Sequence, residues 1–143
     1  MTQVDFYVLS TTDPTARRVF SCRLAEKAWK AGHRVYFRVS DATEAGILDD
    51  LLWTFRQGSF VPHSLTGSET DNPPVAVLIG TGKAPETHRG LLINLTASPP
   101  EDWQSFPRIA EIVIADETIR REGRNKFRFY QTHNLKPVTH KLD

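Results

Sequence analysis

A basic and aromatic stretch near the C-terminus is the part of the sequence best suited to binding chemistry. Residues 120–128 carry five Arg or Lys side chains and one Glu, a local charge of +4 in a chain whose net charge is +1. The remainder therefore carries −3, so positive charge is concentrated here. On a helix, Arg121, Arg124 and Arg128 would lie three and four residues apart, with Phe127 beside them. Such a face is suited to phosphates or an acidic peptide, although a solvated basic surface is the simpler alternative. The opposite side of the helix would face the core with Ile119, Gly123, Lys126 or Phe127, and Tyr130.

A second stretch is rich in aromatic side chains. Trp53 and Phe55 are followed closely by Phe60, which begins the segment Phe60-Val61-Pro62-His63. Large aromatic side chains commonly fill a core, and that interpretation stays open here. The alternative is a surface for a partner protein, because aromatic anchors dominate the energetics of protein interfaces.

The glycine-rich segment at residues 80–83 has the wrong spacing for a phosphate-binding loop. A P-loop places four residues between its first glycine and the Gly-Lys pair, and a Ser or Thr follows the lysine. Here only Thr81 separates Gly80 from Gly82, and Ala84 follows Lys83. The sequence therefore favours an ordinary turn over nucleotide binding.

Catalytic and metal-binding signatures are missing from the sequence. The five histidines show no His-Glu-x-x-His pattern, and the single cysteine, Cys22, has no second cysteine to bind metal with. There is no Gly-x-Ser-x-Gly segment for a serine nucleophile. We therefore expect no metal, no cofactor and no enzymatic activity.

Alternating segments of strand and helix character must position these residues. Strands are expected at residues 4–9, 34–39, 75–79, 91–95 and 109–114. Helices are expected at 13–32, from Asp41 with an apolar stripe reaching Leu52, and from about 116 to 130. Residues 66–74 are expected to form a surface loop, and the tail from Thr132 to be frayed or an edge segment. This alternation predicts an α/β fold, in which helices cover both faces of a central, largely parallel sheet.

Composition is that of one globular domain, expected over residues 1–143. The chain is 39% hydrophobic and 24% charged, both close to the average for such proteins. One cysteine is consistent with a reducing compartment. No apolar run approaches the ~20 residues that span a bilayer, and the first residues do not resemble a signal peptide. We expect a cytoplasmic protein without membrane contact.

Several segments, in order along the chain, resemble one known family. They are Val-Asp-Phe-Tyr-Val-Leu at 4–9, Ala-Trp-Lys-Ala-Gly-His-Arg-Val at 28–35, Leu52-Trp53, Ser-Phe-Val-Pro-His at 59–63, and Arg124-x-Lys126-Phe127-Arg128-x-Tyr130. Together they make the sequence similar to the chi subunit family of bacterial DNA polymerase III. Gln131 stands at an often basic position, and residues 133–143 follow the family poorly.

The resemblance implies a Rossmann-like sheet without a nucleotide site and a non-catalytic adaptor of the replisome. One implied partner is the psi subunit, which connects chi to the clamp loader, and an XPD-type helicase is implied as an alternative occupant of the psi surface. The other is the acidic C-terminal tail of the single-stranded DNA-binding protein, which ends in Pro-Phe. Weak or no direct DNA binding is implied.

The resemblance also assigns residues to each partner. Arg124 is expected to clamp the terminal carboxylate of the tail, and Phe127 and Val113 to form an apolar wall. Arg128 is expected to supply forked, charge-assisted bonds beside Arg124, and Arg121 or Lys126 the surrounding positive charge. The psi surface is expected at Trp53, Phe60, Val61 and Pro62.

Two other functions stay open. The same basic-aromatic helix could bind single-stranded nucleic acid directly, although a groove that follows several nucleotides needs basic charge beyond one helix. The sheet topology alone is also typical of nucleotide-using enzymes, but no catalytic residues support that function.

Overall fold

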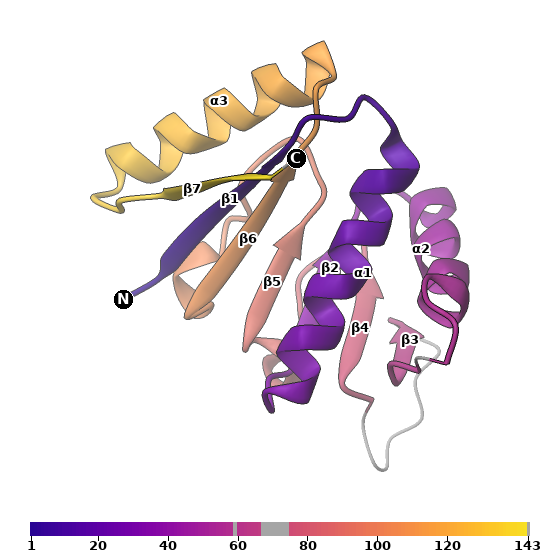
Figure 1. Ribbon diagram of the computed structural model, residues 1–143. Helices are drawn as coiled ribbons and strands as arrows, with labels where there is room; N and C mark the ends of the chain where they lie inside the picture. Colours follow the sequence, from indigo (N-terminus) through magenta and orange to yellow (C-terminus); the bar gives the residue numbers. More distant parts are fainter. Residues whose placement is uncertain (59, 67–74, 143) are drawn as a thin grey trace.

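In the part of the chain that the structure describes, seven parallel strands form one open sheet at the centre of the molecule (Figure 1). The computed structural model describes residues 1–58, 60–66 and 75–142. The order across the sheet is β3-β4-β2-β5-β6-β1-β7. The strands are β1 (Gln3–Leu9), β2 (Val35–Arg38), β3 (His63–Leu65), β4 (Val77–Gly80), β5 (Leu91–Asn94), β6 (Arg108–Val113) and β7 (Val138–Leu142).

Helices cover both faces of this sheet. Helices α1 (Pro14–Lys30) and α2 (Ala42–Thr54) lie on one face, and α3 (Glu117–Thr132) lies on the other (Figure 1). Two short 3₁₀ helices, η1 (Glu86–His88) and η2 (Trp103–Ser105), interrupt the connections around β5. Each α-helix begins after an aspartate whose carboxylate accepts a hydrogen bond from a backbone amide of the first turn.

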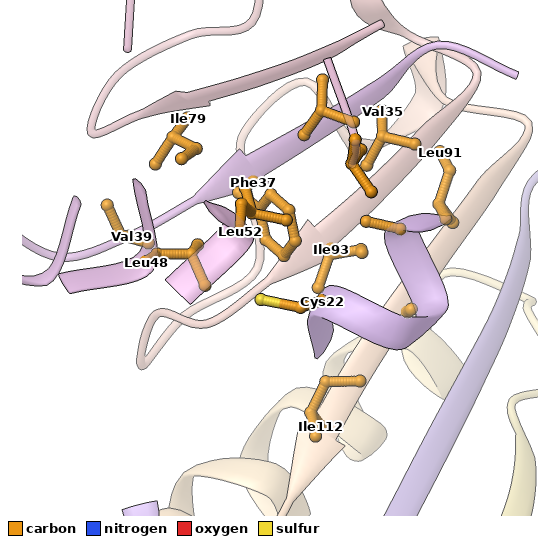
Figure 2. Packing of buried hydrophobic residues seen from close by; sticks show 14 of the residues in the cluster. Cys22, Val35, Phe37, Val39, Leu48, Leu52, Ile79, Leu91, Ile93 and Ile112 are labelled. Atoms are coloured by element: carbon orange, nitrogen blue, oxygen red, sulfur yellow. The ribbon is translucent and has the colours of Figure 1, made fainter. Parts of the chain in front are cut away.

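The alternation of side chains along each strand divides the core in two. On the α1 and α2 face, Phe37 and Ile93 pack with Leu48, Leu52 and Cys22 in a wholly apolar cluster (Figure 2). The cluster on the α3 face is centred on Phe6, Tyr36, Leu92, Ile109, Val113 and Tyr130. Neighbouring residues of one strand therefore serve different layers, which is the three-layer arrangement that the sequence predicts.

The fold class predicted from the sequence is confirmed. All five expected strands and all three expected helices are present, with ends shifted by a few residues. The tail is an edge strand, since β7 pairs in parallel with β1. The sequence did not predict β3, which is only three residues long and too short to show a periodic pattern. Ser59 and residues 67–74, which include most of the expected loop, lie outside the described residues.

None of the described helices is both long enough and apolar enough to cross a membrane.

Candidate functional site

A hollow of about 230 Å³ opens between α3 and strands β1, β6 and β7 of the sheet beneath it. Its lining comes from α3, β1, β6 and β7, and consists of Phe6, Val8, Val113, Arg120, Gly123, Arg124, Phe127 and Thr139. Three of the residues assigned to peptide binding from the sequence, Val113, Arg124 and Phe127, therefore line one hollow.

The floor and wall of the hollow are apolar. Phe6 on β1 packs against Phe127 on α3 with their ring centroids 5.1 Å apart. Gly123 lets the helix approach β6 closely, because a Cβ at this position would lie 3.0 Å from Cγ2 of Val113. A larger side chain at Gly123 would push the helix away from β6 or fill the hollow. The hollow can thus accept an apolar side chain.

Two arginines stand at the rim of this hollow. Arg120 and Arg124 are exposed and four residues apart, so both lie on one side of α3. Within the part of the chain that the structure describes, neither guanidinium forms an ion pair or a side-chain hydrogen bond. Their donors are therefore available to a carboxylate or phosphate bound at the hollow.

Lys126 is placed differently from these arginines. It is only 3% exposed, and its Nζ donates hydrogen bonds to Oε1 of Glu111 at 2.7 Å and to the carbonyl oxygen of Thr96 at 2.8 Å. Glu111 is fully buried on β6. The sequence left open whether Lys126 or Phe127 faces the core. Lys126 lies in the core, and the charge of Glu111 neutralises it there. It cannot belong to the surface charge around the hollow, which corrects that assignment.

The buried ion pair belongs to a larger polar network. Oε2 of Glu111 accepts hydrogen bonds from the Tyr130 hydroxyl at 2.7 Å and from Nδ2 of Asn94 at 3.0 Å. Burial, together with the charge of Glu111, raises the pKa of Tyr130 far above its ordinary value, so the phenol stays protonated and donates. Lys126 and Tyr130 both project from the inner side of α3. The network therefore holds one side of α3 against β5 and β6 and leaves the side with Arg124 outward.

The other two arginines predicted for the site are near the hollow but outside it. Arg121 and Arg128 are exposed on α3 and do not line the hollow. Sequence reasoning did not assign Arg120, Phe6, Val8 or Thr139 to this site. The first had a local signal, since Arg120, Gly123, Arg124 and Phe127 follow the i, i+3, i+4, i+7 spacing of one helix face. The strand residues had none, because only the sheet order brings them under α3.

A second exposed surface lies at the end of α2. Trp53 is 57% exposed and Phe60 is 52% exposed, and their ring centroids are 5.1 Å apart. The His63 ring packs edge-to-face against Trp53 at 5.1 Å. Its Nδ1 lies 2.6 Å from the carbonyl oxygen of Val61 and its Nε2 lies 3.1 Å from that of Asp49, which fixes the ring. The two exposed rings thus have a rigid support.

Val61 does not share this exposure. It is fully buried and belongs to the apolar cluster under α1 and α2, whereas Pro62 is partly exposed. Val61 was assigned to the partner surface from the sequence, but its side chain can only support that surface from inside. The sequence could not separate these neighbours because the segment has no regular pattern.

The segment at residues 80–83 forms a turn, as the sequence favours. The Tyr36 hydroxyl donates a hydrogen bond to the carbonyl oxygen of Gly82 at 2.7 Å and so fixes the turn. The adjoining pocket combines Arg38 and Lys83 with the carboxylates of Glu101 and Asp102. Among the described residues, no cluster of three His, Cys, Asp or Glu side chains is placed to hold a metal ion.

Comparison with known proteins identifies the family of this chain. The family model of the DNA polymerase III chi subunit, HolC, matches residues 1–137. The chain belongs to the DNA polymerase III chi subunit family. It is 44% identical to the DNA polymerase III subunit chi of Pseudomonas aeruginosa over 142 residues, which cover 99% of this chain and 98% of that protein. It is 27% identical to the subunit chi of Escherichia coli strain K12 over 147 residues, covering 99% of this chain and all of that protein.

The likeness to a solved structure concerns the fold alone. The crystal structure of T4 UvsW superposes with a TM-score of 0.66 at 6% identity, covering 98% of this chain and 42% of that chain.

Membership of the chi family makes this protein an accessory subunit of DNA polymerase III in DNA replication, which is consistent with a non-catalytic role.

Proposed function

We propose that this chi-family protein is an adaptor that captures the acidic C-terminal tail of the single-stranded DNA-binding protein in the hollow under α3. The observation that carries the proposal is the combination of an apolar hollow with the free guanidinium groups of Arg120 and Arg124 at its rim. A tail that ends in phenylalanine offers a ring for the hollow and a terminal carboxylate for the rim.

The size and charge of the site agree with this ligand. A cavity of about 150 Å³ is enough to hold benzene, and this hollow measures about 230 Å³. Phe127 and Val113 line the place proposed for the ring, and Arg124 is the carboxylate clamp. Arg121 and Arg128 lie further along the exposed side of α3 and would attract the acidic residues that precede the terminal Pro-Phe.

The direct test is titration of the protein with a fluorescent copy of the tail, followed by anisotropy. Peptides that lack the terminal phenylalanine should bind at least tenfold more weakly, because they lose the ring that fills the hollow. Peptides whose terminal carboxylate is amidated should lose as much, because they lose the charged hydrogen bonds to the arginines at the rim. Arg124→Ala should weaken binding by a similar factor without loss of stability, since an exposed arginine contributes little to folding.

Arg121→Ala is the matched control, because it removes an exposed arginine of the same helix that does not line the hollow. It should weaken tail binding only a few-fold. Equal affinity of the Arg124→Ala protein and the wild type would refute the proposed clamp. No binding by a folded sample at low salt would refute peptide capture altogether.

The Trp53 and Phe60 surface is proposed as the site for the psi subunit, through which chi would reach the clamp loader. Two adjacent exposed aromatic rings on a rigid support are typical anchors of an apolar interface. Pro62 borders them, while Val61 contributes only from the core. An XPD-type helicase is the alternative occupant proposed for this surface, and it would give the protein a role in DNA repair. A binding experiment in which helicase and psi compete for this protein would test whether both use the same surface.

Direct binding of single-stranded nucleic acid by α3 is the second candidate function. The four exposed arginines of α3 favour it, because phosphates bind the same guanidinium groups as carboxylates do. Titration with oligonucleotide in the absence of any partner distinguishes the two functions. In the proposed adaptor, Arg124→Ala changes peptide affinity much more than oligonucleotide affinity.

A further inference from the structure

Positive charge is not confined to α3. Helix α1 contains five basic residues and one acidic residue, Glu26, so its net charge of +4 equals that of residues 120–128. The two basic helices lie on opposite faces of the sheet (Figure 1). Basic charge is therefore present outside α3, and because it lies on the other face of the sheet it would form a site separate from the hollow.

The basic residues of α1 fall into two groups. Two of them are engaged inside the protein, since Nε of Arg17 donates to the carbonyl oxygen of Ile112 at 2.8 Å and Arg18 pairs with Glu44 at 2.7 Å. Arg23, Lys27 and Lys30 are exposed and follow the i, i+4, i+7 spacing of a single stripe.

The stripe is poorly neutralised. Within the described parts of the chain, Arg23 and Lys27 form no ion pair or side-chain hydrogen bond. Glu26 on the same helix is 5% exposed and lies 3.8 Å from Lys30 but 2.8 Å from Arg56. Cations in the last turn of a helix favour its dipole, but this does not account for Arg23, which precedes that turn, or for the exposed Arg34 beyond the helix.

An open hollow of about 440 Å³ continues the stripe past the end of α1. The chain turns at Gly32, whose positive φ of 92° permits the turn, and the hollow is lined there by Trp29, His33 and Arg34. Trp29 is partly exposed and packs against the core with its other side. An aromatic ring held in place beside a row of cations is the arrangement on which single-stranded nucleic acids bind, with phosphates on the cations and a base stacked on the ring.

We propose that the α1 stripe, defined as Arg23, Lys27, Lys30 and Arg34 with Trp29 at its end, is a weak contact site for single-stranded nucleic acid. An acidic peptide that ends in an apolar side chain is less suited to it, because the stripe is a row of charges beside one aromatic ring and lacks the two packed phenylalanine rings that line the hollow under α3. The proposal does not depend on tail capture, since the two sites share no residue.

The test is titration of the wild-type protein at low salt with a fluorescent oligothymidylate of about 16 nucleotides, a site length within the range of known single-strand binders. The triple variant Arg23→Ala/Lys27→Ala/Arg34→Ala should bind at least tenfold more weakly. Its slope of log affinity against log salt should be smaller by about 2, which is ~0.7 for each lost phosphate contact. Lys30 is kept because it lies beside Glu26.

Two controls locate the site and identify the class of ligand. Arg121→Ala/Arg128→Ala, which removes charge from α3, should leave oligothymidylate binding within about twofold of wild type, and the triple variant should bind the tail peptide normally. Polyglutamate at the same charge concentration should not displace the oligonucleotide. Binding should quench tryptophan emission in the wild type and much less in Trp29→Phe.

The inference is overturned if the triple variant binds oligothymidylate like the wild type, or if only the α3 variant loses binding. Effective competition by polyglutamate, without quenching of Trp29, would instead make the stripe a surface for an acidic protein and would also overturn it.

Discussion

The two faces of the sheet are built on different chemistry. Under α1 and α2 the buried cluster is wholly apolar and includes Cys22, Phe37 and Leu48. Under α3 the apolar residues surround a buried ion pair between Glu111 and Lys126, which is extended by hydrogen bonds to neighbouring side chains. Directional bonds occur on both faces, since Arg17 on α1 donates to the carbonyl oxygen of Ile112 and Glu26 pairs with Arg56. Among the described residues, only on the α3 face do these bonds form an ion pair that is itself buried between helix and sheet.

This difference has a consequence for the candidate sites. Apolar packing fixes the separation of a helix from a sheet but tolerates small rotations and substitutions of similar volume. A buried ion pair with defined partners favours one rotation of the helix about its axis. We expect the Lys126–Glu111 pair to fix the rotation of α3 in this way and so to keep Arg124 at the rim of the hollow. The aromatic surface of Trp53 and Phe60 is supported by the His63 ring, which hydrogen bonds hold in place, and by Val61 in the apolar cluster.

The largest expected effect comes from breaking the buried network. Lys126→Ala should lower the free energy of unfolding by about 3–5 kcal/mol, because it leaves the Glu111 carboxylate buried without its cation. Urea denaturation monitored by circular dichroism measures the loss. Lys126→Ala should also weaken tail binding by the molecules that remain folded, because the rotation of α3 is no longer fixed.

Leu48→Ala provides the comparison on the apolar face. It should cost about 2–5 kcal/mol through the cavity that it creates, yet tail affinity per folded molecule should not change. Equal effects of the two substitutions on tail affinity would show that the network has no special role in placing the hollow.

A smaller effect, confined to binding, is expected from the exposed residues of the two faces. Arg124→Ala should cost about 1.5–3 kcal/mol in tail binding, the usual value of a hydrogen bond to a charged group, and should leave psi binding unchanged. Trp53→Ala should cost about 2 kcal/mol or more in psi binding and leave tail binding unchanged. Calorimetric titration of each variant with each partner measures all four values. Loss of both partners in either variant would contradict the separation of the two sites.

Stability at alkaline pH should test the apolar cluster under α1 and α2, because Cys22 belongs to it. Burial raises the pKa of the Cys22 thiol from 9.0 to about 12. Because the folded state keeps this proton while the unfolded state releases it, the contribution of Cys22 is complete below pH 9 and is lost between pH 9 and about 12. The loss is at most about 1.4 kcal/mol per pH unit. Urea denaturation of Cys22→Ala between pH 8 and pH 10 should show a shallower decline than the wild type, and parallel declines would exclude this cause.

The smallest expected effect is the difference in salt dependence between the two partners. Screening should weaken tail binding, since exposed arginines contact an acidic peptide. Psi binding should change little, because its proposed anchors are uncharged rings. Anisotropy titrations at low and at physiological ionic strength compare the two slopes. Equal slopes would remove the proposed contrast between a charged site and an apolar site.

The sequence by itself determined five strands, the three α-helices, the fold class and the family. Alternation in residues 34–39 and the helical spacing around Leu48 have local causes, because a strand repeats every two residues and a helix every 3.6. Those same periods place Arg124 and Phe127 on one part of α3, and Val113, which was also assigned to this site from the sequence, lines the same hollow. Their role in tail capture stays a prediction.

Only the tertiary structure decided which residues are free to bind. Lys126 and Arg124 are two residues apart in one basic stretch, but Lys126 lies opposite Glu111 in the core while Arg124 faces solvent. Phe6, Val8 and Thr139 reach the hollow because β6, β1 and β7 are neighbours in the sheet. The pairing of distant strands leaves no periodic signal in the sequence. Burial, and with it the availability of each charge, is therefore decided by how the helices and strands pack.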